Sequence, residues 1–170
     1  MQSADVKIMA LRRGRSGGPD AAEVLSRKVG DSVLFLYNRR VGLGPERGDI
    51  DIITVAPAGV FVIDPKKYEG SRVRRNRAGD MFVIDGRRRA GLAVSMRRHI
   101  EAVAIAVSEG PTPEAAVSGA YCFIGANLPL RQLIVDDVPA RGLRGTVRML
   151  KESGPLDAAD RTMLRADLAR

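Results

Sequence analysis

The chain has 170 residues, of which 45% are hydrophobic, and a net charge of +8. That length predicts a single domain, and with no Trp, four Phe and three Tyr its core must consist mainly of aliphatic side chains. No apolar run approaches the roughly 18 residues of a membrane span, so we expect no membrane partner. The single cysteine, Cys122, excludes a disulfide within the chain and is typical of a reducing compartment, so we expect a cytoplasmic protein.

The positive charge is concentrated in one part of the chain. Residues 65–99 contain eleven Lys and Arg against three Asp and Glu, an excess that equals the net charge of the whole chain. Arginines gathered in this way are expected of a protein that contacts the phosphate backbone of nucleic acid. Charge alone is equally compatible with a solvated, arginine-rich face that binds nothing.

Hydrophobic spacing and turn residues predict an α/β fold. Apolar residues recur at three- and four-residue spacing in the expected helices and in short runs in the expected strands. In chain order we expect a helix at 19–29, strands at 33–37, 49–56 and 59–66, a weaker strand pair at 71–75 and 80–85, a helix at 90–109, strands at 118–125 and 131–135, and helices at 141–152 and 157–168. The central sheet should be mixed, because its hairpin is antiparallel while helices precede and follow it.

Residues 1–18 differ in composition from the rest of the chain. They end in a basic, Gly-rich stretch, which is typical of a flexible segment. We therefore expect a lead-in over 1–18 and a single domain over 19–170.

The apolar runs on either side of Pro57-Ala58 predict a β-hairpin, and this hairpin fixes the relative positions of two acids and a lysine. If Pro57 and Ala58 form the turn, Asp51 lies directly opposite Asp64. Side chains alternate between the faces of a strand, so both carboxylates share one face with Lys66. Opposed Cβ atoms are roughly 5 Å apart, and two carboxylates there repel unless a cation lies between them. The spacing therefore indicates a site for a hard cation such as Mg²⁺, which prefers oxygen ligands.

This arrangement has a hydrolytic and a structural interpretation. A water held by such a cation can become a nucleophile, and Lys66 would stabilise the charge on an attacked phosphate or orient the water. In the alternative, Asp51 and Asp64 are solvated strand ends and Lys66 merely pairs with one of them. A turn longer than Pro57-Ala58 would also shift the register by one residue.

The hairpin resembles the core of a known family. The segment from Gly48 to Gly70 is similar to the NERD (nuclease-related) domain, which is itself similar to the restriction-endonuclease-like, or PD-(D/E)XK, nucleases. The family pattern is an Asp in the first hairpin strand, an acid-x-Lys motif that ends the second, then an aromatic residue and a glycine. Those positions are occupied here by Asp51, Asp64, Lys66, Tyr68 and Gly70.

The resemblance implies a restriction-endonuclease-like fold, in which helices flank a mixed central sheet and further helices follow at the C-terminus. It also implies a nuclease that hydrolyses phosphodiester bonds with Mg²⁺ or Mn²⁺ and with Asp51, Asp64 and Lys66 in its site. Relatives complete the site with a Glu from a Gly-Glu pair in the first helix. Glu23 is the corresponding acid here, without that Gly, and is the expected third metal ligand. Many relatives have Gln where this chain has His99, which would bind phosphate or act on a water.

The arginine-rich hairpin follows the candidate site directly in the chain, where it would hold a nucleic acid, with DNA as the expected substrate. The arginines assigned to this contact are Arg72, Arg74, Arg75, Arg77, Arg87, Arg88 and Arg89. Two alternatives stay open: a NERD domain that binds nucleic acid without cleaving it, and a protein-interaction module whose acidic cluster is a relic. The sequence leaves the oligomeric state open.

Overall fold

The structure is a computed structural model that describes residues 21–41 and 48–170, so the expected lead-in over 1–18 lies outside the described residues. In chain order the elements are α2 (Ala21–Val29), β1 (Leu34–Val41), β2 (Gly48–Ala56), β3 (Gly59–Lys67), β4 (Val73–Arg75), β5 (Phe82–Ile84), β6 (Arg87–Arg89), α3 (Gly91–Ser108), β7 (Val117–Ile124), β8 (Leu133–Val135), β9 (Val138–Gly142), α4 (Leu143–Leu150) and α5 (Ala158–Leu168). None of the helices within these residues is long and apolar enough to cross a membrane.

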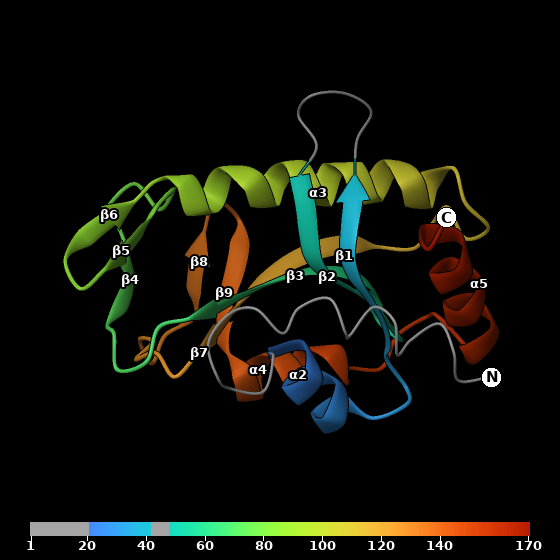
Figure 1. Ribbon diagram of the computed structural model, residues 1–170, viewed down its shortest axis with the longest axis horizontal. Coiled ribbons are helices and arrows are strands. Elements are labelled where there is room, and N and C mark those ends of the chain that lie inside the picture. Colours follow the sequence, from blue (N-terminus) through green and yellow to red (C-terminus); the bar gives the residue numbers. More distant parts are fainter. Residues whose placement is uncertain (1–20, 42–47) are drawn as a thin grey trace.

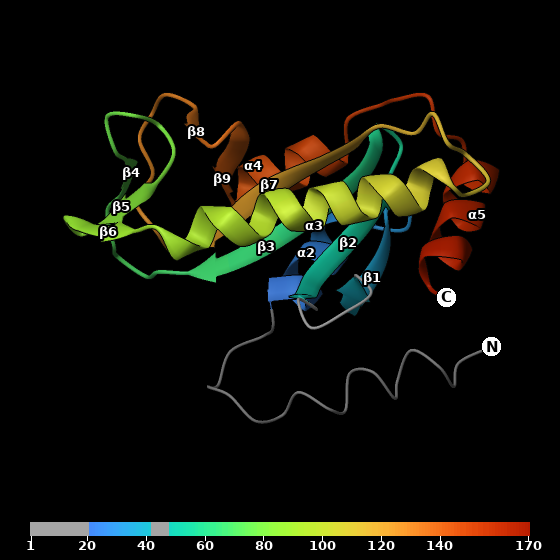
Figure 2. The ribbon, with the colours of Figure 1, turned by 90° about the horizontal axis from the view of Figure 1, so that it is seen from above.

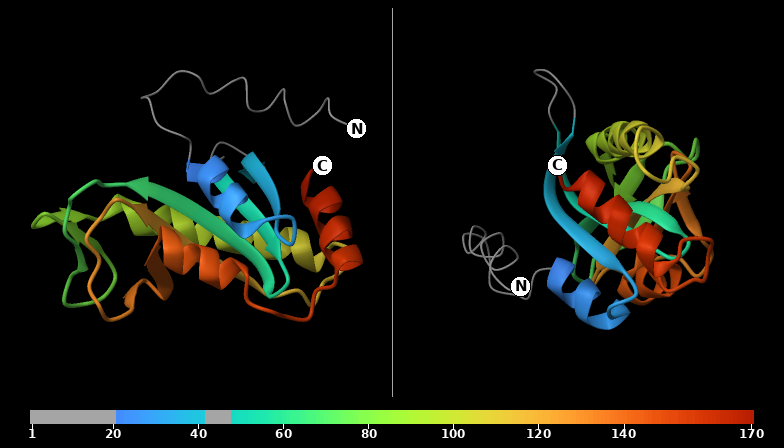
Figure 3. Two further views of the ribbon diagram at one scale, coloured as in Figure 1. Left: turned by 90° about the horizontal axis from the view of Figure 1, so that it is seen from below. Right: turned by 90° about the vertical axis from the view of Figure 1, so that its right-hand side faces the viewer.

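A six-stranded sheet forms the centre of the domain, in the order β1-β2-β3-β7-β9-β8. β1, β2 and β3 form an antiparallel meander, β7 pairs in parallel with β3 and β9, and β8 is antiparallel to β9. Helix α3 crosses one face of the sheet, whereas α2 and α4 lie on the other (Figure 1, Figure 3). The expected mixed sheet flanked by helices is therefore confirmed.

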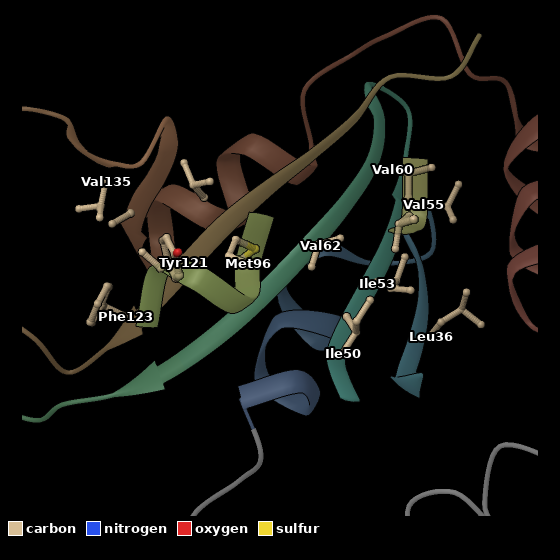
Figure 4. Packing of buried hydrophobic residues seen from close by; sticks show 14 of the residues in the cluster. Leu36, Ile50, Ile53, Val55, Val60, Val62, Met96, Tyr121, Phe123 and Val135 are labelled. Atoms are coloured by element: carbon tan, nitrogen blue, oxygen red, sulfur yellow. The ribbon is translucent and has the colours of Figure 1, made fainter. Parts of the chain in front are cut away.

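The face beneath α3 carries the larger hydrophobic core. Val55, Val60 and Val62 project from the β2–β3 hairpin into a cluster with Met96 of α3 and Tyr121 of β7 (Figure 4). Val60 and Val62 are two residues apart on one strand, so alternation gives them the same face. The register of the hairpin therefore decides which residues of β3 point toward α3.

The opposite face packs against α2 and α4. Leu25 of α2 and Leu150 of α4 meet Phe61 and Ile63 of β3 and Cys122 of β7 in a second cluster. Cys122 is a free, buried cysteine, and burial raises the pKa of its thiol. A buried thiol that resists ionisation serves as a small hydrophobe, which agrees with its apolar sequence context.

A second, three-stranded antiparallel sheet, β4-β5-β6, packs against the α3 side of the core. The Phe82 ring of β5 meets the Tyr121 ring edge-on, with centroids 4.8 Å apart, and the Phe123 ring at 5.3 Å. Phe82 is fully buried. The basic segment that the sequence predicts as a hairpin is therefore a small sheet fixed to the main one by aromatic packing.

Two strands escape the sequence-based prediction. β6 follows β5 through Asp85-Gly86. β9 follows β8 through Asp136-Asp137, where the sequence predicts no strand after 135 and a helix from 141. All four turn residues have positive φ, between 49° and 78°. That is the conformation of a two-residue type I′ hairpin turn, and it returns the chain as a strand. β9 therefore occupies 138–142 and delays the helix to Leu143.

We expect the aromatic contact to be the main attachment of the small sheet. Phe82→Ala should lower the free energy of unfolding by about 3–5 kcal/mol, because it leaves a cavity between the small sheet and β7. Val83→Ala, on the other face of the same strand, should cost about 1 kcal/mol or less. Urea denaturation with an unchanged m-value measures both, and equal losses for the two variants would contradict the packing described here.

Candidate active site

The β2–β3 hairpin turns at Pro57-Ala58, with Ala56 paired to Gly59 as expected. Its ladder continues to Ile52 and Ile63 and stops one pair short of Asp51 and Asp64. Figure 2 shows β2 and β3 diverging away from their turn. On its other side β3 remains paired with β7 as far as Lys67. The end of β3 is thus supported by β7 and open toward β2.

Asp64 and Lys66 stand together at this opening. They are two residues apart on β3 and share the α3 face with Val62. The Lys66 Nζ lies 2.9 Å from an Asp64 carboxylate oxygen, and the two side chains are 22% and 18% exposed. Burial raises the pKa of Asp64, while the charge of Lys66 and its hydrogen bond act in the opposite direction. The pair is therefore shielded from water but still accessible to a ligand.

Asp51 and His99 are within electrostatic reach of the same carboxylate. The charge of Asp51 raises the pKa of Asp64, and His99 of α3 lowers it. Both side chains are half-buried. The structure therefore gathers Asp51, Asp64, Lys66 and His99 around the end of β3, three of them from the hairpin and one from the helix above it.

The backbone of β2 is irregular at Asp51. Strict alternation would put Ile50 and Ile53 on opposite faces, yet both belong to the cluster beneath α3. The pairing of β1 with β2 skips Asn38 and Asp51, and Asn38 has a positive φ of 50°. The direction of the Asp51 side chain therefore does not follow from alternation alone. Its position opposite Asp64 follows from the register of the hairpin.

Tyr121 is a neighbour of the site that sequence reasoning missed. It pairs with Asp64 across the parallel β3–β7 ladder, and its hydroxyl donates to the Leu92 carbonyl at 3.3 Å. Burial, followed by the charges of Asp64 and Asp136, raises the pKa of Tyr121 far above its ordinary value. Tyr121 is thus a permanently neutral wall of the site. Its apolar strand context signals burial, but a parallel register between distant strands leaves no local sequence signal.

Glu23 is not brought to this cluster. It lies on α2, which packs on the other face of the sheet, and its side chain is about half exposed. Its carboxylate pairs with Arg27 one turn along the helix, at 3.6 Å. The assignment of Glu23 as the third metal ligand stays a prediction.

The seven arginines of the basic segment are exposed but do not share one surface. Arg74 and Arg88 pair with Val83 on one face of the small sheet. Arg75 and Arg89 pair with Phe82 on the other face, at the two edges. The small sheet therefore presents its positive charge in several directions, and a single phosphate backbone cannot contact all seven arginines through one face.

The donor set fits a sparsely coordinated ion. Within residues 21–41 and 48–170, no three His, Cys, Asp or Glu side chains gather closely enough to hold a metal by themselves. Mg²⁺ commonly takes one or two carboxylates and retains several waters, and Asp51 and Asp64 supply such a pair. The Lys66 ammonium contacts one Asp64 oxygen. A carboxylate has two oxygens and about four lone-pair sites, so this contact does not prevent Asp64 from binding a cation as well.

The Asp64 carboxyl should titrate above its ordinary value of 3.8. The folded protein then holds this proton more tightly than the unfolded chain, so the group lowers stability as the pH rises from 3.8 to the folded-state pKa. Lys66→Met should raise the pKa of Asp64 further, whereas Lys67→Met, which removes a lysine paired with Glu69, should leave it unchanged. Carboxyl NMR titration measures both. A wild-type pKa at or below the ordinary value would contradict the described burial.

Comparison with known families gives a match to the model of the nuclease-related domain, NERD, over residues 13–124. Comparisons with curated proteins and with solved structures give no match. The matched range includes Asp51, Asp64, Lys66 and His99, the small sheet and α3, and it ends with β7. It spans well over half of the chain, and the hairpin that holds the acid-x-Lys motif lies inside it. The chain therefore belongs to the NERD, or nuclease-related domain, family.

Proposed function

We propose that this domain is a phosphodiesterase that cleaves DNA with the help of Mg²⁺ or Mn²⁺. The observation that carries the proposal is the convergence of Asp64, Lys66, Asp51 and His99 at the opening between β2 and β3. Carboxylates of this kind bind a hard cation, and a nearby lysine and histidine are suited to a phosphate. Membership of a nuclease-related family supports the same reaction class.

Asp51 and Asp64 would hold the ion, which when bound lowers the pKa of water and neutralises charge on the phosphoryl oxygens. Lys66 is a flexible cation with three N–H donors. It can donate to Asp64 and also to a non-bridging oxygen of the scissile phosphate, where it stabilises the charge that grows there. His99 faces the same opening from α3 and would contact the phosphate or accept a proton from water. Tyr121 keeps water out behind Asp64.

A second candidate function is binding without cleavage. It is favoured by the direct ion pair between Lys66 and Asp64 and by the position of Glu23, whose carboxylate pairs with Arg27 on the far side of the sheet. In that case the Lys66–Asp64 salt bridge serves only to stabilise the hairpin. The arginines of the basic segment alone then bind the nucleic acid. The two candidates differ in whether Asp51 and Asp64 are needed for a chemical step.

We expect labelled DNA to be cleaved in the presence of Mg²⁺ or Mn²⁺ and to stay intact in EDTA. Asp51→Ala and Asp64→Ala should each lower the cleavage rate by at least about 100-fold. Each variant removes a proposed metal ligand, which costs more than the loss of a residue that only orients a ligand. Lys66→Ala should lower the rate by about 10²–10³-fold through loss of charge stabilisation. Single-turnover cleavage assays measure all three variants.

Asp31→Ala is the matched control, because Asp31 is an exposed acid in the turn after α2. This variant should leave the rate of DNA cleavage unchanged. Glu23→Gln separates two roles: a metal ligand loses activity as Asp51→Ala does, whereas a residue that only pairs with Arg27 does not. Wild-type protein that binds DNA yet never cleaves it with either metal would refute the phosphodiesterase and favour the second candidate.

A further inference from the structure

The segment between β7 and β8, residues 125–132, runs along β4 and is held there by hydrogen bonds. The Val73 N–H donates to the Asn127 carbonyl at 3.0 Å, and the Asn127 N–H donates to the Ser71 carbonyl at 2.8 Å. The Asn127 side-chain amide also donates to the Gly70 carbonyl at 2.9 Å. The segment therefore forms a fixed wall beside β4.

A groove of about 520 Å³, hereafter the β4 groove, lies between β4 and this wall. Among the described residues that line it, the charged ones are all cationic: four arginines and no Asp or Glu. The polar lining residues are Arg72, Arg74, Arg75, Arg131, Asn127 and Gln132. Guanidinium groups gathered around one hollow repel one another unless an anion lies between them. The groove is thus built for a negatively charged ligand.

A second hollow of about 410 Å³ lies on the other side of the wall, against β9 and the start of α4. It shares Arg131 and Gln132 with the β4 groove and adds Arg141. Together the two hollows are lined by five arginines, with Arg131 common to both. The cationic surface therefore continues from β4 across Arg131 to β9.

Leu130 stands on the wall that both hollows share, beside Arg131. Of the large hydrophobic side chains that the described residues expose, it is the most exposed, at 109% of its reference area. A single exposed leucine is ordinary in itself. Here it lies next to cationic hollows, a combination that suits a ligand with both charged and apolar parts. Phosphates with sugars and bases beside them have this character, and apolar side chains commonly contact base steps.

We propose that the β4 groove and Leu130 bind the phosphodiester backbone of a nucleic acid, with the arginines on phosphates and Leu130 on a sugar or base. This rests on the proposed function, since it takes the substrate to be nucleic acid, and it adds where that substrate lies. A small anion would need donors that converge on one point. Arg72 and Arg74 instead stand about 6.6 Å apart along the chain, and Arg131 lies on the wall, an arrangement that follows a polymer.

The groove is within reach of the candidate active site on a single substrate. Arg72 follows Lys66 by six residues, which limits their separation to about 20 Å. A DNA strand rises about 3.4 Å per nucleotide, so both sites fall within about six nucleotides of each other. The arginines of the basic segment fall into two groups. Arg72, Arg74 and Arg75 line the groove, whereas Arg88 and Arg89 on β6 do not.

This division supplies the test. The 170-residue protein carrying Asp64→Ala is titrated with fluorescently labelled duplex and single-stranded DNA in EDTA, so that cleavage cannot interfere. Arg74→Ala/Arg131→Ala removes two groove arginines, and Arg88→Ala/Arg89→Ala removes the same charge from β6. All four side chains are exposed, so both double variants should fold. Leu130→Ser removes the apolar contact without changing charge.

On duplex DNA the groove variant should flatten the plot of log affinity against log salt by about 1.8, which corresponds to a loss of about 60-fold at 0.1 M salt. The β6 variant should change the slope by much less, and Leu130→Ser should weaken binding with the slope unchanged. Equal losses in the two double variants would show diffuse charge attraction and overturn the groove, as would a groove variant that binds like its parent. Binding only to anionic vesicles or an acidic protein, and not to DNA, would also overturn it.

These outcomes are independent of cleavage. If the wild-type protein cleaves DNA while the groove variant binds normally, the proposed function stands and the proposed role of the groove is refuted. If the protein binds DNA through the groove but never cleaves it, the role of the groove stands and the phosphodiesterase activity is refuted.

Discussion

The site depends on where two strand ladders end. β2 and β3 separate after Ile52 and Ile63, where Asp51 and Asp64 would otherwise stand directly opposed, and β3 stays paired with β7 as far as Lys67. Like charges at opposed positions weaken strand pairing, so the acids that form the site also favour the opening that exposes it. The end of β3 is thus paired with β7 on one side and unpaired on the side of β2. The pairing with β7 fixes Asp64 and Lys66, and the opening toward β2 leaves room for a ligand.

The ion pair at this opening favours function over stability. Burial raises the pKa of Asp64, and the charge and hydrogen bond of Lys66 offset only part of that increase. A largely buried carboxylate whose pKa is raised by burial, and which lies near a second acid, is more readily explained by a cation-binding role than by a structural one. In the proposed reaction Asp64 holds the Lys66 ammonium beside the metal site, where one of its three N–H donors can reach the phosphate.

Local patterns in the sequence predict the local parts of this molecule. Pro57-Ala58 and the alternation around it predict the hairpin register, and helical spacing predicts α3 to within a residue at each end. β6 was predictable from Asp85-Gly86, a strong signal for a type I′ turn, but β9 was not, because Asp136-Asp137 is an unusual pair at such a turn. The neighbours of the site from distant strands, such as Tyr121, depend on a parallel register that no local pattern encodes.

The proposed divalent-ion site at Asp51 and Asp64 can be tested by an anomalous difference map from crystals soaked in Mn²⁺. We expect a peak between the two carboxylates, and no such peak in crystals of Asp64→Ala. A wild-type map without a peak at this position at saturating Mn²⁺ would contradict the proposed site.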